Sequence, residues 1–254
     1  MNRAPPPDWR PPDRLIAIAA SPRSGTSMLG TVMAQTGSLG IPHEWLHVGF
    51  SWPPSVTELP NSTVEQCCRL LLANGLTPNG VGAVKLFGIY FVGIVAEIDF
   101  PRWFPNVSWV WLRRRDLLRQ AVSLAFAWRS GKWTSTDGGP ATVSYSSSLL
   151  RHCLKSLLLH DGVWRGYFAG RGVAPLPLWY EDVADRLEDT VRAIAAHAGV
   201  PLAREPDESR LKLRRQATEE NERWVERFLA EPDAAGLIAR LDAARGLSGT
   251  RGSA

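Results

Sequence analysis

Short apolar runs alternate with longer segments of helical periodicity along this 254-residue chain. The runs at 15–20, 81–87 and 107–112 predict strands, and the run at 107–112 is apolar on both faces, which is typical of strands inside a parallel sheet. A fourth run, 174–180, contains two prolines, and because proline cannot donate a ladder hydrogen bond we expect it at an edge or only over a short stretch. Helical periodicity predicts helices over 25–35, 63–73, 91–98, 116–129, 149–168, 187–198 and 218–229.

The alternation of strand and helix predicts an α/β fold of three layers, with a central, mostly parallel sheet and a helical C-terminal part. Residues 1–13 contain five prolines and four charged residues without an apolar run, so we expect a flexible leader. Residues 14–254 have no internal repeat and no linker-like composition, and we expect them to form a single domain.

The segment 16–30, IAIAASPRSGTSMLG, has the pattern of an anion-binding loop. A buried strand leads into a tight turn of small residues and then into a helix, so that backbone N–H groups converge on one anion. Gly25 permits a close approach of the backbone, and the hydroxyls of Ser24, Thr26 and Ser27 can add donors. We therefore expect a P-loop-like fold.

The loop differs from the nucleoside-triphosphate motif G-x-x-x-x-G-K-[ST] in the place of its cation. Thr26 stands where the motif has lysine, and Arg23 brings a positive charge into the loop instead. A guanidinium beside a helix N-terminus suits a 5′-phosphate that carries one transferable group.

Three further side chains are candidates for chemistry beside the anion-binding loop. Lys85 lies near the end of a predicted strand, where α/β sheets bind ligands, and it is either an anion ligand or half of a structural ion pair. Glu44 lies in the chain after the predicted helix 25–35 and can act as a general base. The neighbouring His43 is the alternative base.

Charge and cysteine content narrow the function classes. The net charge of +4 is concentrated in two short arginine-containing clusters, 113–115 and 212–215, which suits a small anionic ligand better than a long polyanion. The three cysteines have no zinc or disulfide spacing, so we expect buried thiols in a cytoplasmic protein. No apolar run reaches the roughly 18 residues of a membrane span.

Five segments, in order, resemble PAPS-dependent sulfotransferases, and in particular the bacterial trehalose 2-sulfotransferase-type family (PAPS is 3′-phosphoadenosine 5′-phosphosulfate). The loop SPRSGTS at 21–27 resembles the family's 5′-phosphosulfate-binding loop. The other segments similar to family motifs are TGSLGIPHEW at 36–45, GAVKL at 82–86, LRRRD at 112–116 with QAVS at 120–123, and RQA at 215–217 with WVER at 224–227.

The resemblance implies an enzyme that moves the sulfonate of PAPS to a hydroxyl of a small acceptor and releases PAP, the 3′,5′-bisphosphate, without a metal. It implies that Glu44 is the general base and that Arg114 and Ser123 bind the 3′-phosphate, with Arg113 and Arg115 as competitors for that role. Arg214 and Arg215 are expected to close over the nucleotide, or else to form a solvated basic face.

The acceptor remains open among a sugar, a lipid and a secondary metabolite. Residues 86–90 read LFGIY, without the polar side chains expected for holding a disaccharide. The resemblance is compatible with a homodimer. Two other functions remain as alternatives: a P-loop small-molecule kinase, disfavoured by the missing lysine, and a non-catalytic basic module that binds nucleic acid.

Overall fold

The computed structural model describes residues 2–47, 63–133, 143–211 and 219–247. Four parallel strands form its sheet in the order β2-β1-β3-β4, which confirms the predicted α/β fold. The strands are β1 Arg14–Ala20, β2 Val81–Phe87, β3 Val107–Arg113 and β4 Leu176–Trp179. The helices are α1 Thr26–Gln35, α2 Val64–Asn74, α3 Gly88–Glu97, α4 Phe100–Trp103, α5 Leu117–Ser130, α6 Ser147–Arg171, α7 Tyr180–Asp185, α8 Leu187–Ala198, α9 Glu219–Leu229 and α10 Ala234–Ala244.

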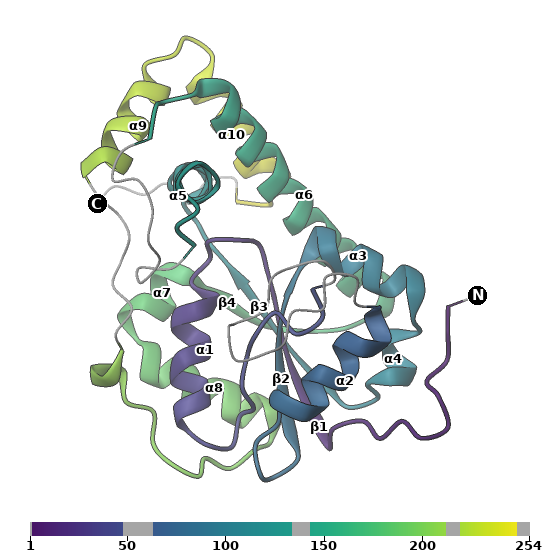
Figure 1. The fold of residues 1–254 in the computed structure, drawn as a ribbon. Coiled ribbons are helices and arrows are strands. Elements are labelled where there is room, and N and C mark those ends of the chain that lie inside the picture. Colours follow the sequence, from purple (N-terminus) through teal and green to yellow (C-terminus); the bar gives the residue numbers. More distant parts are fainter. Residues whose placement is uncertain (1, 48–62, 134–142, 212–218, 248–254) are drawn as a thin grey trace.

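Helices cover both faces of the sheet, and a third group of helices lies beyond its upper edge (Figure 1). On one face, α1 and α8 pack against Ile16, Ile18 and Ala20 of β1. On the other face, α2, α3, α4 and the second half of α6 enclose a core rich in aromatic residues. The first half of α6 packs with α5, α9 and α10 into a separate helical core, and α9 and α10 belong to the predicted helical C-terminal part.

The strand register brings the ends of β1 and β2 together. Ala20, the last residue of β1, pairs with Phe87 of β2, and Lys85 pairs with Ile18. The loop after β1 and the end of β2 therefore lie at the same carboxyl edge of the sheet, beneath α5 (Figure 1). The short strand β4 is at the sheet edge, as its prolines predict.

The predicted leader lies against the domain over its described residues. Trp9 is 6% exposed, and its indole N–H donates to the carbonyl of Trp103 at 2.8 Å. Arg3 forms a parallel bridge with Ile98. A buried tryptophan anchors the segment, because burying such a ring removes a large apolar surface from water. The flexibility of the leader, residues 1–13, stays a prediction.

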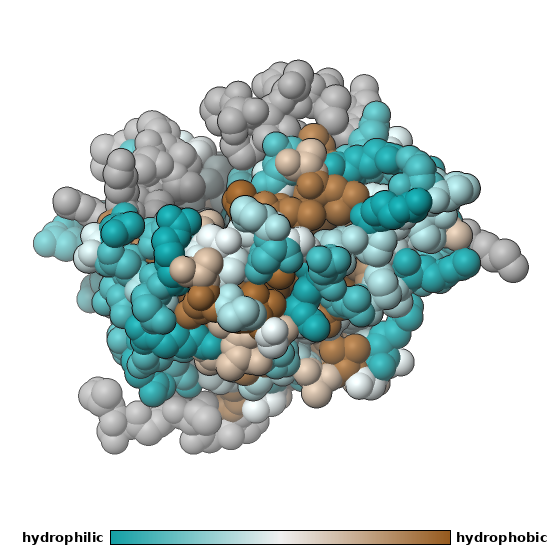
Figure 2. Space-filling view, turned by 90° about the horizontal axis from the view of Figure 1, so that it is seen from below, coloured by the Kyte–Doolittle hydropathy of each residue, from teal (hydrophilic) through white to brown (hydrophobic). Residues whose placement is uncertain are grey.

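The side of the molecule opposite the carboxyl edge of the sheet has a mostly hydrophilic surface. Figure 2 shows this side, on which β1 begins, with hydrophobic residues in patches between hydrophilic ones. Cys67, Cys68 and Cys153 are buried thiols, as expected. None of the helices in the described residues is long and apolar enough to cross a membrane.

Candidate active site

The loop after β1 is shaped by one glycine. Gly25 has φ of +88°, and a Cβ at this position would lie 2.6 Å from Cδ2 of Tyr180. Glycine is therefore required both for the left-handed backbone and for the close packing of the Tyr180 ring. No side chain caps α1 at Gly25, and the first N–H groups of a helix have no intrahelical partner. The geometry is that of an anion-binding helix N-terminus.

Arg23 occupies an uncommon backbone conformation in this loop. Its φ is +65°, the one positive value among described residues other than glycine, and such conformations persist where surrounding contacts enforce them. Its Nε donates to Ser123 Oγ at 3.0 Å, and Nη1 donates to the carbonyl of Trp133. The strand-loop-helix unit thus holds the Arg23 guanidinium against α5.

The three consecutive arginines after β3 have different surroundings. Arg113 donates to both oxygens of Asp161, at 2.8 and 3.2 Å, and its guanidinium lies over two tryptophan rings. Arg115 is exposed and makes a two-point ion pair with Asp182, at 2.8 and 2.7 Å. Both of these arginines are engaged by carboxylates.

Arg114 is the arginine that faces the loop. Its Nη1 lies 3.5 Å from the carbonyl of Arg23, and its guanidinium is 4.7 Å from the Tyr180 ring centre. Its Nε is buried and has no hydrogen-bond partner among the described residues, and burial lowers the pKa of the group. A buried donor without a partner is costly, and an incoming anion would satisfy it.

The hydroxyl groups of the loop are used unequally. Ser24 is fully buried, and its hydroxyl donates to the carbonyl of Ser21 at 2.8 Å, so this hydroxyl closes the turn. Thr26 is buried, and Ser27 is exposed. Ser123 lies beside the loop as the acceptor for Arg23.

Two residues that shape the loop were not predicted. Gln120 is fully buried, and its Nε2 donates to Ser21 Oγ at 2.8 Å and to the carbonyl of Pro22 at 2.7 Å. Tyr180 covers Gly25 from the start of α7. Gln120 lies in the QAVS segment, which therefore contained a usable signal, whereas nothing around Tyr180 pointed to the loop.

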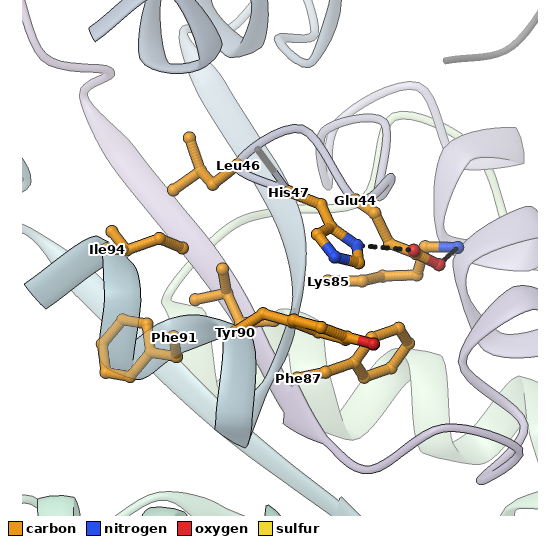
Figure 3. A pocket seen from close by; sticks show the side chains of 9 residues that line it. Glu44, Leu46, His47, Lys85, Phe87, Tyr90, Phe91 and Ile94 are labelled. Atoms are coloured by element: carbon orange, nitrogen blue, oxygen red, sulfur yellow. Dashed lines mark ion pairs between the residues drawn. The ribbon is translucent and has the colours of Figure 1, made fainter. Parts of the chain in front are cut away.

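The loop after α1 returns to the sheet and delivers Glu44 to Lys85. His43 forms a parallel bridge with Val84, and its carbonyl accepts the N–H of Lys85 at 2.8 Å. Glu44 Oε1 then lies 3.6 Å from Lys85 Nζ, and Glu44 Oε2 lies 3.5 Å from His47 Nδ1. The Lys85 side chain is only 7% exposed, and that of Glu44 is 26% exposed. The two candidates therefore form one polar cluster (Figure 3).

The charges in this cluster set its protonation. Burial acts to raise the pKa of Glu44, but the hydrogen bond from His47 and the positive charge of Lys85 outweigh it and hold the pKa below its usual range. Burial, followed by the charge of Lys85, lowers the pKa of His43 to about 4. Glu44 is therefore a carboxylate and His43 a neutral imidazole at neutral pH.

A pocket opens beside this pair, with about 210 Å³ of unfilled space that is partly open to solvent. The charged ends of Glu44 and Lys85 lie on one side of it, and Leu46, Phe91 and Ile94 lie on the other (Figure 3).

Two more of the predicted site residues, Arg214 and Arg215, lie outside the described residues.

The structure thus assembles two clusters at the carboxyl edge of the sheet: Arg23, Arg114 and Ser123 around the loop, and Glu44 with Lys85 on β2. Crevices at this edge are where α/β sheets bind ligands. Among the described residues, no group of histidine, cysteine, aspartate and glutamate side chains is arranged to hold a metal ion.

Comparison with known proteins identifies the class. The model of the Stf0 sulphotransferase family matches residues 97–231, a little over half of the 254 residues, and the chain belongs to this family. The protein is therefore a sulfotransferase, and this assignment favours neither the kinase nor the nucleic-acid module.

The chain is similar to two curated trehalose 2-sulfotransferases over most of their length. It is 27% identical to that of Mycobacterium tuberculosis, covering 88% of this chain and 97% of the relative, and 24% identical to that of Mycolicibacterium smegmatis, covering 87% and 96%. Among solved structures, a sulfotransferase from Alicyclobacillus acidocaldarius shares the fold, with a TM-score of 0.54 and 17% identity over 93% of this chain and 96% of that one.

Proposed function

We propose that the protein transfers the sulfonate of PAPS to a hydroxyl of a small acceptor, with residues 21–27 holding the phosphosulfate. The observation that carries the proposal is that Arg114 contacts both the Arg23 carbonyl and the Tyr180 ring, and that this ring covers Gly25 at the start of α1. Two guanidinium groups beside a helix N-terminus suit a ligand with two separated anionic ends. PAPS has such ends in its 5′-phosphosulfate and its 3′-phosphate.

Arg114 and Ser123 are assigned to the 3′-phosphate. Among the three arginines, Arg113 and Arg115 already have carboxylate partners, whereas the buried Nε of Arg114 has none. Ser123 adds a hydroxyl from α5 and holds Arg23 in place. Because both side chains contact the Arg23 segment, they can bind the nucleotide on the side of the loop that faces α5.

Glu44 is assigned as the general base of an in-line displacement. Its carboxylate takes the proton of the acceptor hydroxyl while the hydroxyl oxygen forms a bond to sulfur. The bond between sulfur and the 5′-phosphate oxygen breaks, and PAP leaves with the electron pair. Such transfers have a loose transition state in which positioning and charge stabilisation dominate. Arg23 and Lys85 can stabilise the charge that develops on the phosphate and sulfonate oxygens.

The ion pair between Glu44 and Lys85 couples donor binding to base strength. With the donor absent, Lys85 contributes to the lowered pKa of Glu44. Once sulfonate oxygens share the Lys85 charge, its stabilisation of the Glu44 carboxylate weakens, so the pKa rises and the carboxylate becomes a stronger base. The base would thus gain strength when the sulfonate is in place.

The acceptor is assigned only as a small hydroxyl compound: a sugar, a lipid or a secondary metabolite. The two mycobacterial relatives carry trehalose in their names, so trehalose is a first compound to test. The location of the pocket beside Glu44 supports an acceptor site there.

Calorimetry with PAP tests the donor assignment. The wild-type protein should bind PAP, and Arg23→Ala should weaken binding by about tenfold or more, as expected for loss of a charge-assisted hydrogen-bond donor. Arg192→Ala is the matched control, because Arg192 on α8 pairs with the carboxylates of Glu188, Asp189 and Glu205. Absence of PAP binding by folded wild-type protein would refute the proposal.

A further inference from the structure

The pocket beside Glu44 is apolar except at one end. Leu46, Phe91 and Ile94 are almost fully buried at its inner side. Figure 3 shows them facing away from the charged ends of Glu44 and Lys85. The apolar lining residues are Leu46, Leu86, Phe87, Phe91 and Ile94, and the polar ones are Glu44, His47, Lys85 and Tyr90.

The polar lining groups contact one another. Glu44 contacts both Lys85 and His47, at 3.6 and 3.5 Å, and the His47 ring lies 4.0 Å from that of Tyr90. A sugar has a hydroxyl on almost every carbon, and each hydroxyl removed from water needs a partner to offset its desolvation. The described lining can place one reacting hydroxyl at Glu44, but it offers few groups for the others.

Two aromatic side chains lie beside the polar end. Phe87 ends β2, and Tyr90 follows in the first turn of α3 with 42% of its surface exposed. Their rings extend beneath the charged ends of Glu44 and Lys85 (Figure 3). Aromatic rings prefer offset or edge contacts with other rings at centre distances of about 4.5–7 Å. A planar aromatic ring bound here would therefore find favourable partners next to the base.

The strength of the base agrees with this lining. With the donor absent, the pKa of Glu44 lies below its usual range, because the His47 hydrogen bond and the Lys85 charge outweigh the effect of burial. Donor binding raises this pKa, but a carboxylate is still a far weaker base than an alkoxide. A weak base removes a proton most readily from an acidic hydroxyl. Phenolic hydroxyls ionise near pH 10, as in tyrosine, and are much more acidic than aliphatic hydroxyls.

We propose that the acceptor is a phenol whose aromatic ring lies against Tyr90 and Phe87 with its hydroxyl at Glu44. This inference rests on the proposed PAPS-dependent transfer. The phenolic proton passes to Glu44, the phenolic oxygen bonds to sulfur, and the bond from sulfur to the 5′-phosphate breaks. The products are an aryl sulfate and PAP, and the proton on Glu44 is released to water.

The test compares 2-naphthol with trehalose as acceptors for the full-length protein, with PAPS as donor and PAP formation as the readout. We expect kcat/KM for 2-naphthol to exceed that for trehalose by about tenfold or more, which is within the discrimination that a pocket contact can supply. A kcat/KM for trehalose that equals or exceeds that for 2-naphthol would overturn the inference.

Substitutions on α3 test the aromatic contact. Tyr90→Ala should raise the KM for 2-naphthol by about fivefold or more, and Tyr90→Phe, which keeps the ring, should restore it. Val92→Ala is the matched control, because Val92 is 49% exposed on the same helix and does not line the pocket. An unchanged KM in folded Tyr90→Ala would place the acceptor elsewhere and overturn the proposal.

PAP calorimetry on the same samples separates the two proposals. If the wild-type protein binds PAP and sulfates trehalose but not 2-naphthol, the phenol inference fails and the donor assignment stands. If the folded protein does not bind PAP, the proposed function itself fails. Tyr90→Ala should leave the Kd for PAP unchanged, since Tyr90 lines the acceptor pocket rather than the loop.

Discussion

Replacing Glu44 by glutamine removes the charge of the expected base and keeps its shape. This substitution has two consequences, which differ in the free energy that each involves. The first is electrostatic: two unit charges 3.6 Å apart attract by about 5 kcal/mol at an effective dielectric constant of about 20. Desolvation offsets much of this attraction, and water can approach the vacated partner, so the net loss of stability should be about 1–3 kcal/mol.

The second consequence is catalytic and larger. Loss of a general base typically lowers the rate by about 10²–10⁴-fold, which corresponds to about 3–5 kcal/mol in the barrier. A domain with about 5–15 kcal/mol of stability remains folded after the first loss. Glu44→Gln should therefore stay folded, bind PAP and turn over poorly.

Single-turnover sulfation of 2-naphthol or trehalose with saturating PAPS, whichever acceptor is active, measures the effect on chemistry. Calorimetry with PAP and thermal unfolding are run in parallel. Glu65→Gln is the matched control, because Glu65 on α2 also pairs with a basic residue, Arg69 at 3.1 Å, away from the pocket. A Glu44→Gln rate within about threefold of wild type would refute the assignment of this carboxylate as base.

Three further predictions follow from particular contacts. Arg114→Ala should weaken PAP binding by about tenfold and reduce the preference for PAP over AMP. Arg115→Ala is the control, because Arg115 is paired with a carboxylate, and it should leave both quantities unchanged. An equal effect of the two substitutions in calorimetry would contradict the assignment. Gly25→Ala should lower the affinity for PAP and cost about 1–3 kcal/mol of stability, because its Cβ would meet a ring carbon at 2.6 Å and φ is +88°, and an unchanged melting temperature would count against this packing. Burial lowers the pKa of His160 from 6.5 to about 4. Between these two pH values the unfolded chain binds more protons than the folded protein, so stability should fall as the pH drops from about 6.5 to about 4. His160→Asn should flatten this pH dependence in thermal unfolding measured against pH.

The sequence predicted the sheet because its strands are distinctive. β1, β2 and β3 are short, nearly continuous apolar runs, and each is buried on both faces. Three helices were not predicted. α4 and α7 are too short for a visible period, and α10 has the alanine-rich sequence AAGLIARLDAA. α10 is held by Ile238 and Leu241 against the helical core, a tertiary contact that its own pattern does not reveal.

Local pattern identified the loop but could not distinguish the arginines after β3. Their roles depend on Asp161 and Asp182, which lie 48 and 67 residues further along the chain from the arginines they bind. The sequence indicated Glu44 and Lys85 separately, and the bridge between His43 and Val84 is what unites them. His47 had no motif of its own, so its contact with Glu44 became visible only in the structure.

The support of Arg114 has a consequence for how the protein matures. Arg245, at the end of α10, donates to the carbonyls of Arg114 and Arg115 at 2.6 and 3.4 Å, and its own carbonyl accepts from Arg113 at 3.0 Å. About 130 residues separate these partners. During synthesis on the ribosome, β3 therefore emerges long before Arg245, the residue that holds the three arginines at the end of this strand. Nascent chains lacking α10 should form the sheet before they acquire a competent nucleotide site.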